Sequence, residues 1–198
     1  SLLRPPKVSK DPIKDLIESK TNNSDLNQCP VAIAQDKAFH FRYPETKEFL
    51  EALNMPLLEW HPLKNEVIPN KAKGLILPGG FPEEYAEEIS CCSTSLGSLR
   101  KAYKKIPIYA ECGGMLLLGQ SITDNLGLSY PMAKILPFHS HKGNLEVGYR
   151  EIKGIKNSLL IRKGEVLIGH EFHRWKIETS YPKGIQTFLD INAPWEVK

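Results

Sequence analysis

The 198-residue sequence is long enough for one sizeable domain, and its 41% hydrophobic and 25% charged residues are typical of a chain that folds around a packed core. Its net charge of +3, from 26 basic and 23 acidic residues, provides no broad positive field, so we expect no nucleic-acid partner. Its apolar runs fall short of the roughly 20 residues that a membrane helix needs, and its start carries no signal-peptide pattern, so we expect no membrane partner.

The four cysteines predict a reducing compartment. Cys91 and Cys92 are adjacent, and no Cys-x-x-Cys pair occurs, so the spacing suits neither an ordinary disulfide nor a zinc cage. Cytoplasmic proteins generally keep their cysteines reduced. We therefore expect a cytoplasmic protein in which all four cysteines, Cys29 and Cys112 included, are thiols.

The start of the chain differs in character from the rest. Residues 1–29 carry three prolines and a polar run, which predict a linker or docking tail ahead of a main domain over residues 30–198. The main domain opens with Val31–Ala34, an apolar run typical of a buried strand. Pro44–Leu53 predicts a helix, because proline is tolerated in the first turn and acidic residues suit the positive helix end.

Further along the chain, short apolar runs alternate with helical patterns. The predicted elements are a strand at 56–58, a strand at 74–77, helices near 83–89 and 96–104, a strand at 106–110 and a helix at 113–120. This β-α-β-α order predicts an α/β fold with an open, mostly parallel sheet flanked by helices. From residue 144 onward the pattern changes to strands, such as 147–152 and 165–177, so added strands are expected in the C-terminal third.

One cysteine stands where an open parallel sheet places its chemistry. Ligands bind beyond the carboxyl ends of such strands, and Cys112 directly follows the strand at 106–110, with Gly113 and Gly114 opening the next helix. Small residues are needed at a sharp strand-to-helix turn of the nucleophile-elbow type. A helix N-terminus favours the thiolate, and the amide after the cysteine can face a developing oxyanion. The alternative is a buried structural cysteine, which is the commoner fate of a single thiol.

A second oxyanion donor is expected from the glycine pair that ends the strand at 74–77. Gly79 and Gly80 expose backbone amides there, as the second loop does in hydrolases that use a nucleophile elbow. A plain glycine-rich turn is the alternative, because a single Gly-Gly pair is a weak signal.

A thiolate nucleophile also needs a base, and the sequence has six histidines. His170, Glu171 and His173 lie in a strand-like stretch, where alternation puts Glu171 and His173 on one face. A carboxylate there could orient the imidazole and stabilise its charged form. Metal ligation is the alternative, but His-Glu-Phe-His lacks the HExxH spacing and no third ligand stands out, so we expect no metal.

Several blocks of the sequence together resemble the cobyrinic acid a,c-diamide synthase family. The blocks follow one another in the family's order, over about residues 30–178: Ala38–Glu45, Gly79–Ala86, Tyr109–Met115, Gly148–Glu151 and Gly169–His173. Several ordered motifs are far more specific than any one of them. The resemblance implies a class I glutamine amidotransferase domain of the cobyrinic/cobyric acid synthase type, with the flavodoxin-like sheet of that class.

The resemblance also implies an activity. In that family a cysteine attacks the side-chain amide of glutamine and a histidine assists. The released ammonia passes to a synthetase domain, where ATP activates a corrin carboxylate for amidation in cobalamin biosynthesis. Cys112 falls on the nucleophile position and His173 on the catalytic histidine, while Gly80 and Gly113 fall on the oxyanion hole. Glu171 is a candidate orienting carboxylate, although the family lacks the usual His-x-Glu order.

The ATP-binding half of such an enzyme is not found in these 198 residues, because no GxxxxGK[ST] phosphate loop occurs in them. The resemblance therefore implies that this domain uses glutamine and no cofactor. ATP and Mg²⁺ are expected in a synthetase domain of the same polypeptide, and the corrin substrate is reached only indirectly. Arg42 and Thr46 depart from the family's usual Tyr and Asn, which affects local contacts and leaves the elbow intact.

Three other functions stay open at this point. The chain could be the amidotransferase domain of a cobyric acid synthase, although Ala38–Glu45 and Gly148–Glu151 favour the diamide enzyme. Peptidase-like and deglycase-like proteins also carry an elbow cysteine on a parallel sheet. A non-catalytic, partner-binding amidotransferase-like module is the third alternative, and the presence of both Cys112 and His173 argues against it.

Overall fold

The structure is a computed structural model that describes residues 28–178 and, as backbone only, residues 189–196. The predicted tail at 1–29 lies almost wholly outside the described residues, so its boundary stays a prediction. The chain divides into two compact units. We call the first, whose described residues are 28–81 together with Cys91–Gly114, the elbow unit. We call the second, whose described residues are Pro82–Ser90, 115–178 and 189–196, the histidine unit.

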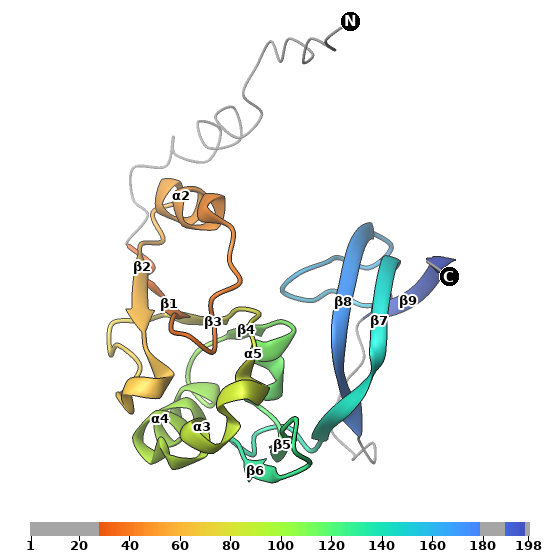
Figure 1. The fold of residues 1–198 in the computed structure, drawn as a ribbon. Coiled ribbons are helices and arrows are strands. Elements are labelled where there is room, and N and C mark those ends of the chain that lie inside the picture. The colour runs from red at the N-terminus through yellow and green to blue at the C-terminus, as the bar shows by residue number, and fades with distance from the viewer. Residues whose placement is uncertain (1–27, 179–188, 197–198) are drawn as a thin grey trace, which may run out of the picture. The chain divides into compact units, whose positions relative to one another are not determined.

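The elbow unit is built on a sheet of four parallel strands (Figure 1). The strands are β1 (Val31–Ala34), β2 (Leu57–Trp60), β3 (Gly74–Leu77) and β4 (Ile108–Ala110), in the order β2-β1-β3-β4. This order matches the first four strands of a flavodoxin-like sheet, and it reverses between β1 and β3. The predicted open parallel sheet is therefore confirmed.

The helices follow the predicted alternation, except that the short helix at Pro62–Lys64 was not predicted and the helix after Cys112 ends early. They are α2 (Pro44–Ala52), η1 (Pro62–Lys64), η2 (Pro82–Tyr85), α3 (Ala86–Cys91), α4 (Ser93–Tyr103) and α5 (Gly113–Leu116). In α4, Ser95, Leu96, Leu99 and Ala102 are buried, at the three- and four-residue spacing of one helix face. The side chain of Asn65, just after η1, accepts a bond from the amide of Thr94 at 2.8 Å, which satisfies an open donor at the start of α4.

Apolar burial holds the short strands of this sheet in place. All four residues of β1 are buried, because neighbouring strands and covering segments leave neither of its faces in water. Trp60, at the end of β2, is fully buried, and its indole Nε1 donates to the carbonyl of Glu66 at 3.1 Å. The large buried side chains of Ile33, Leu75 and Leu77 complete this core.

The histidine unit contains a second, mixed sheet of five strands (Figure 1). These are β5 (Ser121–Thr123), β6 (Ser129–Pro131), β7 (His139–Gly154), β8 (Val166–Glu178) and β9 (Leu189–Glu196). The order is β6-β5-β7-β8, and β9 pairs with β7. The added C-terminal strands are confirmed, although β7 begins eight residues earlier than predicted, at His139 instead of 147. The β5–β6 hairpin and β9 were not predicted.

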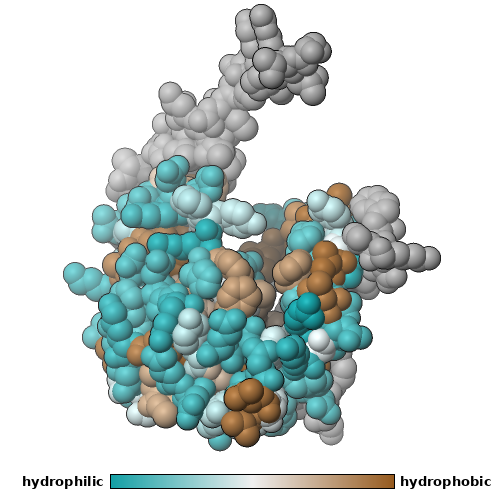
Figure 2. Space-filling model, in the orientation of Figure 1, coloured by the Kyte–Doolittle hydropathy of each residue, from teal (hydrophilic) through white to brown (hydrophobic). Residues whose placement is uncertain are grey.

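The long strand β8 differs in character from the buried strands. No residue of β8 is buried, and its charged and apolar side chains are all at least partly in water. Ile168 is 67% exposed and Phe172 is 63% exposed, and Figure 2 shows apolar surface over the region of β7 and β8. Pairing with β7 over most of its length therefore holds β8 in place, rather than burial of its side chains.

The helix after Cys112 is shorter than predicted. It ends at Leu116 instead of residue 120, and the chain continues in turns. The carbonyl of Leu117 accepts from the amide of Ala133 at 3.0 Å, and that of Gly119 accepts from Lys134 at 2.8 Å. The amide of Gln120, which a helix to residue 120 would bond to the carbonyl of Leu116, instead donates to the carbonyl of Phe138 at 2.7 Å. This is a tertiary effect that local propensity does not reveal.

Candidate active site

Three loops follow the carboxyl ends of strands in the elbow unit. Gln35 and Asp36 follow β1, Pro78–Gly80 follows β3, and Glu111 with Cys112 follows β4. These strands are neighbours and parallel, so the loops lie along one edge of the sheet, at the place where its strand order reverses. The predicted position of the chemistry is therefore the position that the topology favours.

Cys112 adopts the backbone conformation of a nucleophile elbow. Its φ is +47°, a left-handed value that is uncommon for a residue with a side chain, and it is exposed. The amide of Glu111 donates to the carbonyl of Leu77 at 3.1 Å, and the amide of Gly114 donates to Glu111 at 2.9 Å. Among the described backbone bonds, none uses the amide of Gly113. The turn thus presents both a thiol and an adjacent N–H group.

Glycine at position 114 is required by a close approach. A Cβ built there would lie 2.2 Å from the carbonyl oxygen of Leu77, a distance that real Cβ atoms do not show. The short helix that begins after Cys112 therefore packs directly onto the end of β3. This contact holds the two loops that carry the candidate oxyanion donors at a fixed separation.

Glycine at position 80 is equally constrained, whereas a Cβ at position 79 would make ordinary van der Waals contacts. A Cβ at Gly80 would lie 2.1 Å from the carbonyl oxygen of Ala38, and a Cβ at Gly79 would lie 3.5 Å from the Cβ of Cys112. The amide of Phe81 donates to Ala38 at 3.0 Å, whereas within the described residues the amide of Gly80 donates to no backbone carbonyl. The loop thus borders the cysteine and leaves one N–H available, as an oxyanion hole requires.

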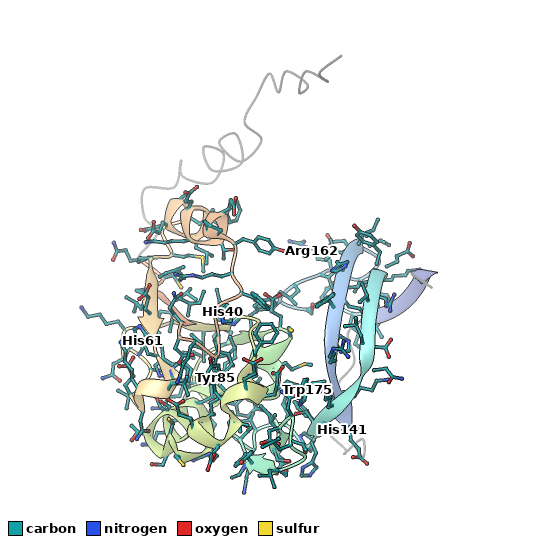
Figure 3. The ribbon with its side chains drawn as sticks, in the orientation of Figure 1. His40, His61, Tyr85, His141, Arg162 and Trp175 are labelled. Carbon is teal, nitrogen blue, oxygen red and sulfur yellow. The ribbon has the colours of Figure 1, made fainter. Side chains whose placement is uncertain are left out.

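Aromatic residues border the same glycine loop, a feature that sequence reasoning missed. Phe41 donates its amide to the carbonyl of Gly79 at 3.1 Å and is 51% exposed. Its ring lies 4.7 Å from that of His40 and 5.0 Å from that of Phe81, centroid to centroid. His40 is labelled in Figure 3. The aromatic-rich block Ala38–Glu45 was the available signal, because it follows the first predicted strand closely.

Tyr109 and Glu111 form a polar contact beside the candidate nucleophile. The Tyr109 hydroxyl donates to Oε2 of Glu111 at 2.7 Å. Burial, followed by the bond to Glu111 and its charge, raises the pKa of Tyr109 to about 12. The phenol therefore stays protonated at neutral pH and holds the carboxylate that precedes Cys112.

The histidine unit carries the predicted base on β8. His173 is partly exposed, and its Nδ1 lies 3.1 Å from the carbonyl oxygen of Trp175. A carbonyl accepts only, so Nδ1 carries the proton in this contact and Nε2 of the neutral ring keeps a lone pair. The predicted alternation holds, because Glu171 and His173 share one face of β8 and His170 lies on the other.

Glu171 has a different partner from the one expected. Its carboxylate accepts a hydrogen bond from Nη2 of Arg150, whose side chain is only 13% exposed. Nη1 of Arg150 donates to the carbonyl of Tyr149 at 3.0 Å. Among the described contacts, none joins Glu171 to His173. The group that holds the imidazole is instead a backbone carbonyl, which no residue pattern could have revealed.

A buried carboxyl occurs just after the glycine loop in the sequence. Glu83, in η2, is 8% exposed. Burial, with a smaller contribution from the charge of Glu84, raises its pKa to about 6, against the effect of a bond to its own backbone amide. Elsewhere, the described residues contain no group of three or more acidic, histidine or cysteine side chains that could hold a metal ion.

The sequence pattern of the CobB/CobQ-like glutamine amidotransferase domain matches residues 30–196. The chain belongs to this family. It is similar to the cobyrinate a,c-diamide synthase of Synechococcus, with 38% identity over 175 residues that cover 80% of this chain and 38% of the relative. It is 37% identical to the Salmonella typhimurium enzyme of the same name, over 72% of this chain and 32% of the relative. The chain thus spans about a third of the length of these relatives.

A solved structure supports the fold. A glutamine amidotransferase from Thermotoga maritima superimposes with a TM-score of 0.53 at 14% identity, over 83% of this chain and 67% of that one. At this identity the likeness concerns the fold only. In the part of the chain that the structure describes, no helix has the length and apolar character needed to span a membrane.

Proposed function

We propose that this domain hydrolyses glutamine, with Cys112 as nucleophile and His173 as the proton-transfer group. The observation that carries the proposal is the left-handed backbone of Cys112, with φ of +47°, at the end of a parallel strand beside a glycine loop. Strain of this kind costs of order 1–3 kcal/mol and persists where the surroundings and the function require it. Membership of the glutamine amidotransferase family supports glutamine as the substrate of the cysteine at this turn.

The reaction is an acyl transfer in two stages. The Cys112 thiolate attacks the side-chain carbonyl of glutamine, and the amides of Gly80 and Gly113 stabilise the oxyanion. The C–N bond then breaks, and protonated His173 gives its proton to the leaving ammonia. A water molecule next gives a proton to Nε2 of His173 and attacks the thioester. The C–S bond breaks, which releases glutamate and regenerates the thiolate and the protonated imidazole.

The finer proposal concerns the use of the ammonia. Relatives named cobyrinate a,c-diamide synthase share 36–38% identity with this chain over most of its length. We therefore propose that the ammonia passes to an ATP- and Mg²⁺-dependent synthetase domain, which amidates corrin carboxylates in cobalamin biosynthesis in the cytoplasm. The relatives are about three times as long as the matched segment, which leaves room for such a domain. This domain itself needs no cofactor for the proposed hydrolysis.

Covalent labelling tests the nucleophile directly. The glutamine analogue 6-diazo-5-oxo-norleucine should attach to Cys112, as mapped by mass spectrometry of tryptic peptides. Cys112→Ala should abolish labelling and lower glutaminase activity by at least about 10⁴-fold, because the covalent route is lost. Cys91→Ala is the matched control, since Cys91 is also exposed and should be unlabelled in both proteins.

Two results would count against the proposal. Labelling spread equally over Cys91 and Cys112 would show that the elbow does not activate its thiol. Undiminished glutamine hydrolysis by Cys112→Ala would exclude Cys112 as the nucleophile. A protein that neither binds the analogue nor hydrolyses glutamine would support the alternative of a non-catalytic module. Cleavage of peptides in place of glutamine would favour a peptidase-like activity.

A further inference from the structure

A bulge interrupts the pairing of β7 with β8 next to His173. Lys142 pairs with Trp175 and Glu146 pairs with His173, so the three residues 143–145 of β7 stand opposite Arg174 alone. Bulges bend a strand, increase its twist and re-aim side chains, and they are over-represented beside active sites. Arg174 is flanked on β8 by His173 and Trp175, and the ring of His173 bonds to the carbonyl of Trp175. The bulge of β7 therefore stands directly opposite this contact.

Trp175 is itself anchored. Its indole Nε1 donates to the carbonyl of Thr123 on β5 at 2.8 Å, and the Lys142 ammonium lies 5.9 Å from the centre of its ring. In Figure 3 the labelled Trp175 lies toward the end of β8 that faces β5. A carbonyl held by such an anchor gives the Nδ1–H group of His173 a fixed acceptor, at 3.1 Å.

Glu146 is the carboxylate directly across from His173. Residues opposite each other in an antiparallel pair have Cβ atoms about 4.5–5.5 Å apart, so this pair is within electrostatic reach. The Lys176 ammonium donates to Oε1 of Glu146 at 2.9 Å. This bond and the Lys176 charge, with smaller contributions from His173 and Arg150, lower the pKa of Glu146.

The bulge also explains how Lys176 reaches Glu146. Strict alternation puts Lys176 on the face of β8 opposite to His173, and the added twist at the bulge allows its side chain to cross. A Cβ at Gly143 would lie 2.6 Å from Cγ of Lys176, so glycine there lets the lysine stem pass over the bulge.

We propose that this bulge is the device that positions His173 for proton transfer. The Trp175 carbonyl holds the Nδ1–H tautomer, Glu146 faces the ring as its counter-charge, and Lys176 limits the strength of that charge. Glu146 is a positioning residue, whereas Glu171 forms an ion pair with Arg150. The inference rests on the proposed glutaminase function for the role of His173, and its geometry stands on the described contacts alone.

The described charges around His173 are Glu146 and Arg150 on β7 and Glu171 and Lys176 on β8. Arg150 and Glu171 neutralise each other, so the Glu146–Lys176 pair should dominate. Removing the negative charge with Glu146→Gln should move the titration midpoint of His173 to lower pH, by about 0.5–1 pH unit. Lys176→Met should move it to higher pH by a similar amount, because Glu146 then acts without its partner.

The test is a pH titration of the full chain by NMR, with ¹⁵N-labelled histidine, in parent and variants. The ¹⁵N shifts also identify the tautomer, and we expect Nδ1–H in the neutral ring. Glu178→Gln is the matched control, since Glu178 pairs with His141 at 3.9 Å in a more distant part of the same two strands. It should leave the His173 midpoint unchanged. In the pH profile of kcat/KM for glutamine hydrolysis, the midpoint assigned to His173 should shift in the same direction as the NMR midpoint.

The opposite signs make the proposal easy to overturn. Shifts of the same sign for Glu146→Gln and Lys176→Met, or shifts no larger than that of Glu178→Gln, would exclude Glu146 as the counter-charge. An Nε2–H tautomer in the parent would exclude the Trp175 carbonyl as the acceptor. If glutamine hydrolysis is absent, the proposed function fails, and the NMR titration still decides the positioning of His173.

Discussion

The strands β1 and β8 are held in their sheets by different forces. All four residues of β1 are buried, whereas none of the thirteen residues of β8 is. The elbow unit therefore sets its geometry by close packing, as the contact of Gly114 with the end of β3 illustrates. The histidine unit sets its geometry by strand pairing, hydrogen bonds and ion pairs. Steric changes at the end of β3 should therefore disturb the elbow unit, and changes of charge should disturb the contacts along β7 and β8.

The largest effect is expected from a single methyl group in the elbow unit. Gly114→Ala places a Cβ 2.2 Å from a backbone carbonyl, so the backbone must shift, at a cost of about 1–3 kcal/mol in the free energy of unfolding. Gly97→Ala is the matched control in α4, where the nearest atom is a side-chain nitrogen at 3.9 Å. It should stabilise the protein by about 0.5–1 kcal/mol, because alanine favours helix. Urea unfolding measures both, and equal effects would contradict the steric account.

An intermediate effect is expected from pH at Glu83 of the histidine unit. Its folded pKa of about 6 lies above the ordinary value of 4.5, so the folded state binds the proton more tightly. The contribution of Glu83 to stability is therefore fully present below pH 4.5 and is lost as pH rises through 6. Glu83→Gln removes this loss and should stabilise the protein by about 2 kcal/mol at pH 7, and by nearly nothing at pH 4. Thermal unfolding across this pH range checks the trend, and a constant difference would refute it.

The smallest effect is expected from the ion pair between Arg150 and Glu171. A double-mutant cycle with Arg150→Met and Glu171→Gln should give a coupling of about 0.5–1.5 kcal/mol, because both side chains are more than two-thirds buried. The matched pair is Lys47–Glu51 on α2, whose side chains are 61% and 48% exposed at 3.9 Å. Its coupling should stay below about 0.5 kcal/mol and vanish in high salt. Equal coupling energies for the two pairs would show that burial does not strengthen the Arg150–Glu171 pair.

The elbow unit was the more predictable half of the molecule. Val31–Ala34 and Gly74–Leu77 were located to the residue, because a short apolar run bounded by proline or glycine has few alternatives. The turn at Cys112 was also apparent, since a cysteine followed by two glycines after a strand matches the steric needs of an elbow. Whether Cys112, His173, Gly80 and Gly113 act together stays a prediction for the labelling and activity experiments.

The histidine unit was less predictable because its structure depends on partners that are distant in sequence. β7 extends to His139 through polar residues, whose strand conformation comes from pairing with β8 and not from their own propensity. The helix after Cys112 stops at Leu116 for the same kind of reason, since the amide of Gln120 donates to the distant carbonyl of Phe138 and not to that of Leu116.

The sequence by itself determined the family, the parallel sheet and the place of Cys112 at a strand end, because these depend on residue types at short spacings. Only the tertiary structure decided that Glu171 binds Arg150 and that the His173 ring binds the Trp175 carbonyl. Those contacts follow from the register of β7 against β8 and from its bulge. A shift of one residue in that register would turn every side chain to the other face, so no local pattern could have specified them.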